Sequence, residues 1–386
     1  MTTAHPVIDG HNDLPIAFYE LCGYDLDAHD LGGSVPQLHT DLPRLRAGNV
    51  GAQFWSLWVP QDEHAVRRTF EQLDFVHQLV RRFPETLELA TTADEVEAAI
   101  KAGRVASLMG MEGGYSIGES LGVLRTMRTL GVRYMTLTHN NNVPWADSAT
   151  DEAVLGGLND FGEQVVREMN RIGMLVDLSH VSADTMRHAL RVTSAPVIFS
   201  HSSARAVCDV PRNAPDDVLE TLTGNDGVCM VTFVPFFISQ EYVDWVAESD
   251  EIAKANGLSP QRPADQQQVA ELYGKPKPQV VLADVVKHVE HVREWPGSIT
   301  SGSAATTTGF PRRPSTCRTF RRTRGCSRPW PSGSGATRTS QSLPEATFCA
   351  YCALPTTSRS RRPGAGRAGR AAGRTRPPRR WPLHPR

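Results

Sequence analysis

Residues 120–139 read SLGVLRTMRTLGVRYMTLTH. The first part is an amphipathic helical pattern that ends at Gly131, a usual helix stop, and the rest is an apolar run that ends in His139. Six more apolar runs alternate with helical patterns: PVIDGHND (6–13), AQFWSLWV (52–59), VASLMGME (105–112), GMLVDLSH (173–180), PVIFSHSS (196–203) and GVCMVTFV (227–234). Repeated strand–helix alternation predicts a parallel sheet with right-handed crossovers.

The number of alternations predicts a barrel. Seven strands need one more to close an eight-stranded β/α barrel, and no Gly-rich phosphate loop follows the first run. A last amphipathic helix, residues 282–294, should lead into strand eight, but the chain continues as WPGSITSGSAATTTGF (295–310). We therefore expect an α/β fold, a (β/α)8 TIM-type barrel over residues 1–294, with strand eight and the C-terminal helices lost or disordered.

The charge divides the chain at the same place. Its net charge is −1, but residues 295–386 contain 18 Arg, no Lys and one acidic residue, Glu345. That leaves 23 of the 41 basic and 41 of the 42 acidic residues in 1–294. The sequence predicts an acidic barrel domain, 1–294, and an aberrant Arg/Ala/Pro/Gly-rich tail, 295–386. A nucleic-acid-binding arm is the alternative for the tail, although such arms usually mix Lys with Arg.

Targeting and redox signals are weak. The N-terminal residues show no basic segment followed by an apolar run, and no run reaches membrane-spanning length. Three scattered cysteines in residues 1–294 suit a reducing compartment. We expect a cytoplasmic protein without a lipid anchor, a membrane partner or a nucleic-acid partner.

Polar side chains follow the predicted strands at their carboxyl ends. They are His11, Asp13, Glu112, His139, His180 and His201. In a parallel barrel these ends open onto one face, so the six side chains should converge there. Imidazole and carboxylate ligands suit Zn²⁺, and this number of ligands favours two ions, with Glu112 as the bridge between them.

Each candidate also has a simpler interpretation. Asp13 could cap a turn, and Glu112 could pair with an arginine. Arg205 or Arg212 could bind a substrate carboxylate bidentately, or either could be a surface residue, and Asp216 could be a helix N-cap. Four histidines at the ends of four strands make metal binding the stronger interpretation.

Six motifs in family order resemble the membrane dipeptidase (renal dipeptidase) family of zinc metallopeptidases. They are VIDGHNDLP (7–15), AQFWSLWVP (52–60), MGMEGG (109–114), YMTLTHNNNVPWADS (134–148), VDLSHVS (176–182) and VIFSHSSARAVCDVPRNAPDD (197–217). The resemblance implies a β/α barrel that hydrolyses dipeptides with two Zn²⁺ ions, and it allows a homodimer.

The resemblance also implies a role for each site residue. His11 and Asp13 resemble the ligands of one metal, His180 and His201 resemble those of the second, and Glu112 resembles the bridging carboxylate. The remaining two contact substrate: His139 resembles the catalytic histidine near the scissile carbonyl, and Arg212 resembles the arginine that binds the substrate's C-terminal carboxylate.

The family's acid–base aspartate, in a GGDxDG motif after strand eight, has no counterpart here. Codons for ITSGSAATTTG (299–309) shifted by one nucleotide can read DHVGLGGDYDG, which contains this motif and puts its first aspartate at Thr306. Shifted codons further along the tail can also give family-like segments. We therefore interpret the chain from about residue 295 as frameshifted, and we expect reduced activity from the encoded protein.

The sequence supports a metallodipeptidase, with two alternatives. One is another amidohydrolase-like barrel enzyme that cleaves amides or lactams. The other is a non-catalytic metal-binding remnant, which the lost aspartate would favour.

Overall fold

The structure is a computed structural model that describes residues 5–262, 264–295 and 303–304. The chain divides into two compact units, Met1–Leu354 and Pro355–Arg386, and every described residue belongs to the first. The predicted tail of residues 295–386 therefore lies outside the described residues, apart from Trp295 and the pair Ser303–Ala304.

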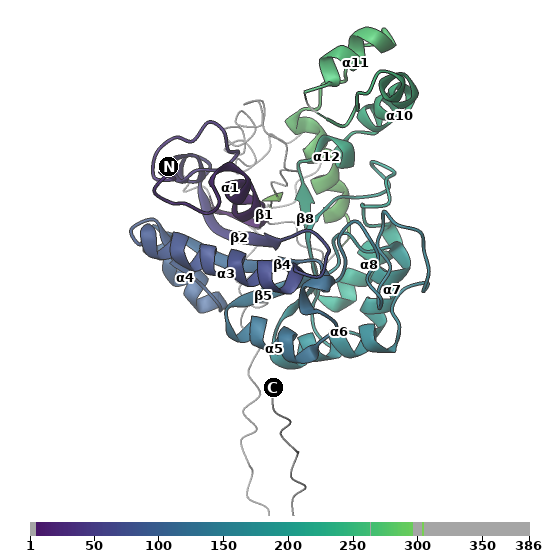
Figure 1. The fold of residues 1–386 in the computed structure, drawn as a ribbon. Coiled ribbons are helices and arrows are strands. Elements are labelled where there is room, and N and C mark those ends of the chain that lie inside the picture. The colour runs from purple at the N-terminus through teal and green to yellow at the C-terminus, as the bar shows by residue number, and fades with distance from the viewer. Residues whose placement is uncertain (1–4, 263, 296–302, 305–386) are drawn as a thin grey trace, which may run out of the picture. The chain divides into compact units, whose positions relative to one another are not determined.

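The strands form one parallel sheet, as the strand–helix alternation predicts. Its order is β1-β2-β4-β5-β6-β7-β8-β9, with β3 paired to β4 off this path. Figure 1 labels β1, β2, β4, β5 and β8 of this sheet. The strands are β1 (Val7–Asn12), β2 (Val50–Trp58), β3 (Leu87–Leu89), β4 (Val105–Glu112), β5 (Val132–Thr136), β6 (Leu175–Asp177), β7 (Ile198–Ser202), β8 (Val228–Thr232) and β9 (Ser303–Ala304). Neighbouring strands follow one another in sequence around most of the sheet, which is the order of a β/α barrel.

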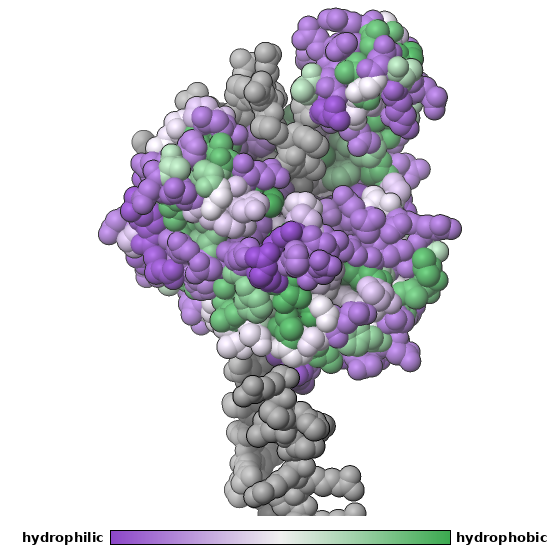
Figure 2. Space-filling view, in the orientation of Figure 1, coloured by the Kyte–Doolittle hydropathy of each residue, from purple (hydrophilic) through white to green (hydrophobic). Residues whose placement is uncertain are grey.

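Helices separate most of the strands. Those before β8 are α1 (Leu14–Cys22), α2 (Leu42–Ala47), α3 (Ala65–Arg82), α4 (Ala93–Lys101), the 3₁₀ turn η1 (Gly114–Ile117), α5 (Leu121–Thr129), α6 (Asp160–Ile172), α7 (Ala183–Val192) and α8 (Asp216–Asn225). After β8 come α9 (Pro235–Ile238), α10 (Gln240–Ala255), α11 (Gln266–Tyr273) and α12 (Leu282–Arg293). The face in Figure 2 is mostly hydrophilic, since the helices turn their apolar sides to the sheet.

A two-residue strand takes the place of the eighth barrel strand. Ser303 and Ala304 of β9 pair in parallel with Val231 and Thr232 of β8, and β9 also lies against β1. The parallel barrel is therefore nearly closed. The C-terminal helices expected to be lost, and Thr306, lie outside the described residues.

The core has two layers, separated by the sheet. The barrel interior contains residues from alternating strand positions, among them Phe54, Leu108, Tyr134 and Met230. A larger cluster, which includes Trp55, lies between the sheet and the helices. A Cβ on Gly110 would lie 1.9 Å from Cζ of Tyr134, so this glycine makes room for the tyrosine ring inside the barrel.

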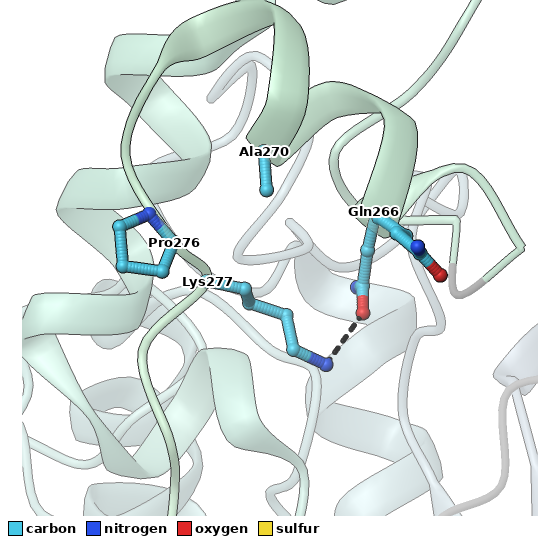
Figure 3. Close-up of a pocket in the computed structure, with 5 residues that line it drawn as sticks. Gln266, Ala270, Pro276 and Lys277 are labelled. Atoms are coloured by element: carbon cyan, nitrogen blue, oxygen red, sulfur yellow. Dashed lines mark hydrogen bonds between the residues drawn. The ribbon is translucent and has the colours of Figure 1, made fainter.

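The segment between β8 and α12 forms a small cluster of its own. Tyr242, Trp245 and Val246 of α10 pack with Val269 of α11. Beside it lies a pocket of about 310 Å³ lined by Gln266, Gln267, Ala270, Pro276 and Lys277 (Figure 3). Within the described residues, no helix is both long enough and apolar enough to span a membrane.

Candidate metal centre

The six predicted site residues all lie at the carboxyl ends of barrel strands. His11 lies in β1, and Asp13 follows at the N-cap position of α1. Glu112 is the last residue of β4, and His201 lies in β7. The loops after β5 and β6 carry the remaining two residues, His139 and His180.

Glu112 lies at the centre of the four histidines. Its Oε1 is 2.9 Å from Nε2 of His180, 3.3 Å from Nε2 of His201 and 3.8 Å from Nε2 of His139. Its Oε2 lies 3.4 Å from Nε2 of His11 and accepts a 3.1 Å hydrogen bond from the Ser56 hydroxyl. Glu112 is only 2% exposed, and its ion-pair partners among the described residues are histidines rather than an arginine.

The ligand atoms fall into two groups that share this carboxylate. One group is His11, Glu112 and His201, and the other is Glu112, His139 and His180. Each group could hold a metal ion, because its ligand atoms lie within 4.8 Å of one another. Buried Nε2 atoms facing one carboxylate are the donors that Zn²⁺ and similar divalent ions prefer. The residues therefore fit a metal centre.

Asp13 extends the first group. Its side chain makes no capping hydrogen bond to α1, although it occupies the N-cap position. Its Oδ1 instead lies 3.2 Å from Nε2 of His11. The alternative of a simple turn cap is therefore wrong for the side chain.

Two glycines after Glu112 let other groups approach. Gly113 has φ +106°, a conformation that side chains rarely adopt. A Cβ on Gly114 would lie 2.4 Å from the Leu137 carbonyl oxygen and 2.4 Å from the Trp145 ring. The loop that bears His139 can therefore pack directly on the end of β4.

Ser148 joins the loops that bear His139 and His180. Its hydroxyl lies 2.6 Å from the His139 carbonyl oxygen and 3.3 Å from that of His180, which also accepts a 2.8 Å bond from the Ala149 amide. His180 has φ +68°, which is unfavourable for a side-chain-bearing residue. These bonds help to hold the strained turn.

Burial and charge act in opposite directions on the titration of the site. Burial would raise the pKa of Glu112, but the charge of His11 and hydrogen bonds from His11 and His180 hold it well below its usual value. Burial lowers the pKa of His139, His180 and His201. Burial also opposes protonation of His11, yet Glu112, Tyr134 and Asp13 together raise its pKa.

Arg212 is a buried cation beside the centre. It is 3% exposed, its guanidinium lies 5.0 Å above the Phe237 ring, and neither Nη atom has a hydrogen-bond partner among the described residues. Burial lowers its pKa to about 10, and its charge contributes to the lowered pKa values of His139 and His180. A carboxylate would satisfy both Nη atoms.

The two weaker candidates have structural roles. Arg205 donates to the carbonyl oxygens of Val210 and Pro211, so it stabilises its own loop. Asp216 is not an N-cap, because Pro215 occupies that position. Its Oδ1 instead lies 2.8 Å from Nε2 of His291 on α12.

Reasoning from the sequence missed several polar residues around the centre, among them Ser56, Tyr134, Asp177 and Ser200. All four are buried in barrel strands. The available signal was a polar residue inside an otherwise apolar run, as in VDLSH and VIFSH.

The fold and the donor set define a β/α-barrel protein with a histidine–carboxylate metal centre. Residues 1–315 match the model of the membrane dipeptidase family (Peptidase family M19), and the chain belongs to this family. The predicted family is therefore confirmed, as is the TIM-type barrel.

Three relatives illustrate the similarity. Dipeptidase verJ of Clonostachys rogersoniana is 46% identical over 243 residues, which are 59% of this chain and 62% of that protein. Dipeptidase 3 of Mus musculus is 48% identical over 235 residues, 59% of this chain and 47% of that protein. A metallopeptidase structure from Rhodobacter sphaeroides, liganded with a phosphinate mimic of the dipeptide L-Ala-D-Ala, has a TM-score of 0.68 and 19% identity, with 91% of this chain and 99% of that chain covered. The chain thus spans about half to three fifths of the length of these two curated relatives.

Proposed function

We propose that this protein is a metallodipeptidase that hydrolyses the peptide bond of dipeptides at a site with two Zn²⁺ ions bridged by Glu112. His11 and Asp13 would be ligands of one ion, and His180 and His201 ligands of the other. The observation that carries this proposal is the single carboxylate, Glu112, shared by two groups of possible ligand atoms. These groups place His201 with His11 and His139 with His180, whereas the proposal pairs His201 with His180, whose Nε2 atoms lie 2.8 Å apart, and leaves His139 for the substrate. Family membership supports the same activity.

The remaining residues of the site suit a small peptide with a free carboxyl group. Such a metal pair supplies an activated water molecule and polarises the peptide carbonyl. Arg212 would bind the C-terminal carboxylate of the substrate through its two unpartnered Nη atoms. His139, 3.8 Å from Glu112 and next to Trp58, would donate to the carbonyl oxygen as negative charge develops there.

Proton transfer to the leaving amine is the step that this chain supports least. A general acid–base is needed there, and the family's aspartate falls at Thr306, whose hydroxyl cannot supply a proton at neutral pH. We therefore propose reduced turnover. Sequencing the gene around codons 294–296 tests the frameshift, and a variant with the restored reading frame should be the more active protein.

The activity itself is tested with purified full-length chain, Zn²⁺ and matched substrates. We expect turnover of dipeptides, and much weaker turnover of dipeptide amides, which lack the carboxylate. Arg212→Met should abolish this preference. Equal cleavage of amides, or cleavage of lactams alone, would favour a different amidohydrolase-like enzyme. Zinc binding without any turnover, even in the restored frame, would favour a non-catalytic metal-binding protein.

Three further expectations stay predictions: the homodimer, the cytoplasmic location and the absence of a nucleic-acid partner. A salt series with the full chain tests the last one, because binding through phosphate contacts weakens steeply with salt.

A further inference from the structure

In two of the four histidines in the centre, the ring nitrogen that faces away from Glu112 is hydrogen-bonded to a hydroxyl group. Nδ1 of His11 lies 3.0 Å from Oη of Tyr134, and Nδ1 of His201 lies 2.8 Å from Oγ of Ser200. In both rings the opposite nitrogen, Nε2, faces Glu112. A neutral imidazole carries its proton on one nitrogen, so the direction of the hydrogen bond at Nδ1 decides which nitrogen has the lone pair.

The direction of the first bond follows from the second partner of Tyr134. A phenol has a single hydrogen, and Oη of Tyr134 also lies 3.1 Å from the carbonyl oxygen of Gly10. A carbonyl oxygen can only accept, so the tyrosine hydrogen is donated to Gly10. Tyr134 must then accept from His11, which places the imidazole proton on Nδ1 and the lone pair on Nε2.

The second bond is directed by a buried carboxylate. Oγ of Ser200 lies 2.6 Å from Oδ2 of Asp177, which also accepts a 2.5 Å bond from the Thr136 hydroxyl. Oδ1 of Asp177 accepts from the amides of Ser179 and Ser200. The carboxylate is fully buried and surrounded by donors, so it takes the Ser200 hydrogen, and His201 must donate from Nδ1.

We propose that Tyr134 and the pair Asp177–Ser200 are positioning residues that fix His11 and His201 as Nδ1–H tautomers and so present both Nε2 lone pairs to the metal centre. His180 provides the contrast, because its Nδ1 is buried without a hydrogen-bond partner among the described residues. The part of this inference that concerns metal binding rests on the proposed function. The tautomers themselves depend only on the hydrogen bonds of the chain.

The barrel register explains why residues so far apart in sequence act together. Glu112 is level with Thr136 on the next strand, and Thr136 is level with Asp177 on the one after. The carboxylate that binds Ser200 therefore lies in the same layer as the carboxylate at the centre. Tyr134 reaches His11 across the barrel interior, through the room left by Gly110.

The first test reads the tautomers directly. Protein with ¹⁵N-labelled histidine, free of metal and at a pH above the titration of its imidazoles, should show Nδ1–H rings for His11 and His201. Asp177→Asn is the sharpest variant: its amide would donate to Ser200, free the serine hydrogen for Nδ1 of His201 and move the ring proton to Nε2. A wild-type spectrum with Nε2–H at either ring, or an unchanged His201 signal in Asp177→Asn, would overturn the proposal.

The second test measures zinc affinity by competition with a chelator. Tyr134→Phe and Ser200→Ala should each weaken binding by about 10–100-fold, the usual effect of losing a partner behind a metal ligand. Ser200→Thr should restore it. Matched controls are Tyr242→Phe, in the α10 cluster, and Ser107→Ala, whose buried hydroxyl has no hydrogen-bond partner among the described residues.

The two tests also separate this inference from the proposed function. Unchanged affinity in both Tyr134→Phe and Ser200→Ala would overturn the positioning role. A wild-type protein that binds no zinc, but has the expected tautomers, would instead contradict the proposed metallodipeptidase. Should Tyr134→Phe fail to fold, Ser200→Ala and Asp177→Asn decide the question, since both preserve the strand and differ little in volume.

Discussion

His288 should make the folded protein sensitive to mild acid. This residue of α12 is fully buried, its Nδ1 accepts from the Ala204 amide at 3.1 Å, and its Nε2 lies 3.2 Å from the Ile238 carbonyl oxygen. Burial is the main cause that lowers its pKa to about 4. The neutral ring thus links α12 to the loop after β7 and to α9.

The direction of the pH effect follows from the two pKa values. In the unfolded chain the imidazole titrates near 6.5, and in the folded protein only near 4. The unfolded state therefore binds the proton first, and the stabilising contribution is complete above pH 6.5 and lost as the pH falls toward 4. Between pH 8 and pH 5 the loss amounts to about 2 kcal/mol of unfolding free energy.

The measurement is urea unfolding of wild type and His288→Asn at pH 8 and pH 5, in the presence of a chelator. The asparagine oxygen can still accept from Ala204, but it does not titrate. Other buried histidines with a lowered pKa, such as His180 and His201, also make the folded protein less stable in acid. The difference between the two proteins therefore isolates His288: wild type should lose about 2 kcal/mol more than the variant. His64→Gln, at an exposed position, is the control. An equal loss in wild type and His288→Asn would refute this account.

Three further perturbations test the site and its loops. Glu112→Gln should lose bound metal in both groups together; retention of one equivalent, measured by elemental analysis, would show that the groups are independent. Gly114→Ala should lower the unfolding free energy by about 1–3 kcal/mol, because the new methyl group meets a backbone carbonyl and the Trp145 ring; an unchanged melting curve would contradict the close packing. Asp147→Asn should expose residues 150–157 to limited proteolysis, because the Asp147 carboxylate accepts hydrogen bonds from the amides of this loop, including those of Leu155 and Gly156. Cleavage of wild type and variant at the same rate would refute this.

The strands of the barrel could be predicted because their apolar runs are long and end in polar residues. All seven predicted strands are present. The sequence also located the six site candidates, of which five contribute atoms to the two ligand groups and the sixth, Asp13, lies beside His11. Strand β3 was missed, since Leu87–Leu89 has three residues and no apolar run. The short helix α2, within LPRLRA, gave no recognisable period either.

The partners of the ligands could not be predicted, for a physical reason. Tyr134 lies 123 residues from His11 in the sequence, and their contact depends on barrel closure and on the space above Gly110. A buried aspartate such as Asp177 looks like any other acid in a sequence. Only the register shows that it lies among donors, next to Ser200.

The centre at Glu112 is assembled from strands at both ends of the barrel sequence, from His11 in β1 to His201 in β7. A partly folded chain that has formed only neighbouring strands would hold at most part of the donor set. Metal would therefore bind late in folding and favour the native state over the unfolded one by mass action. The metal content of the purified protein would then report how much of it has completed the barrel, before any substrate is added.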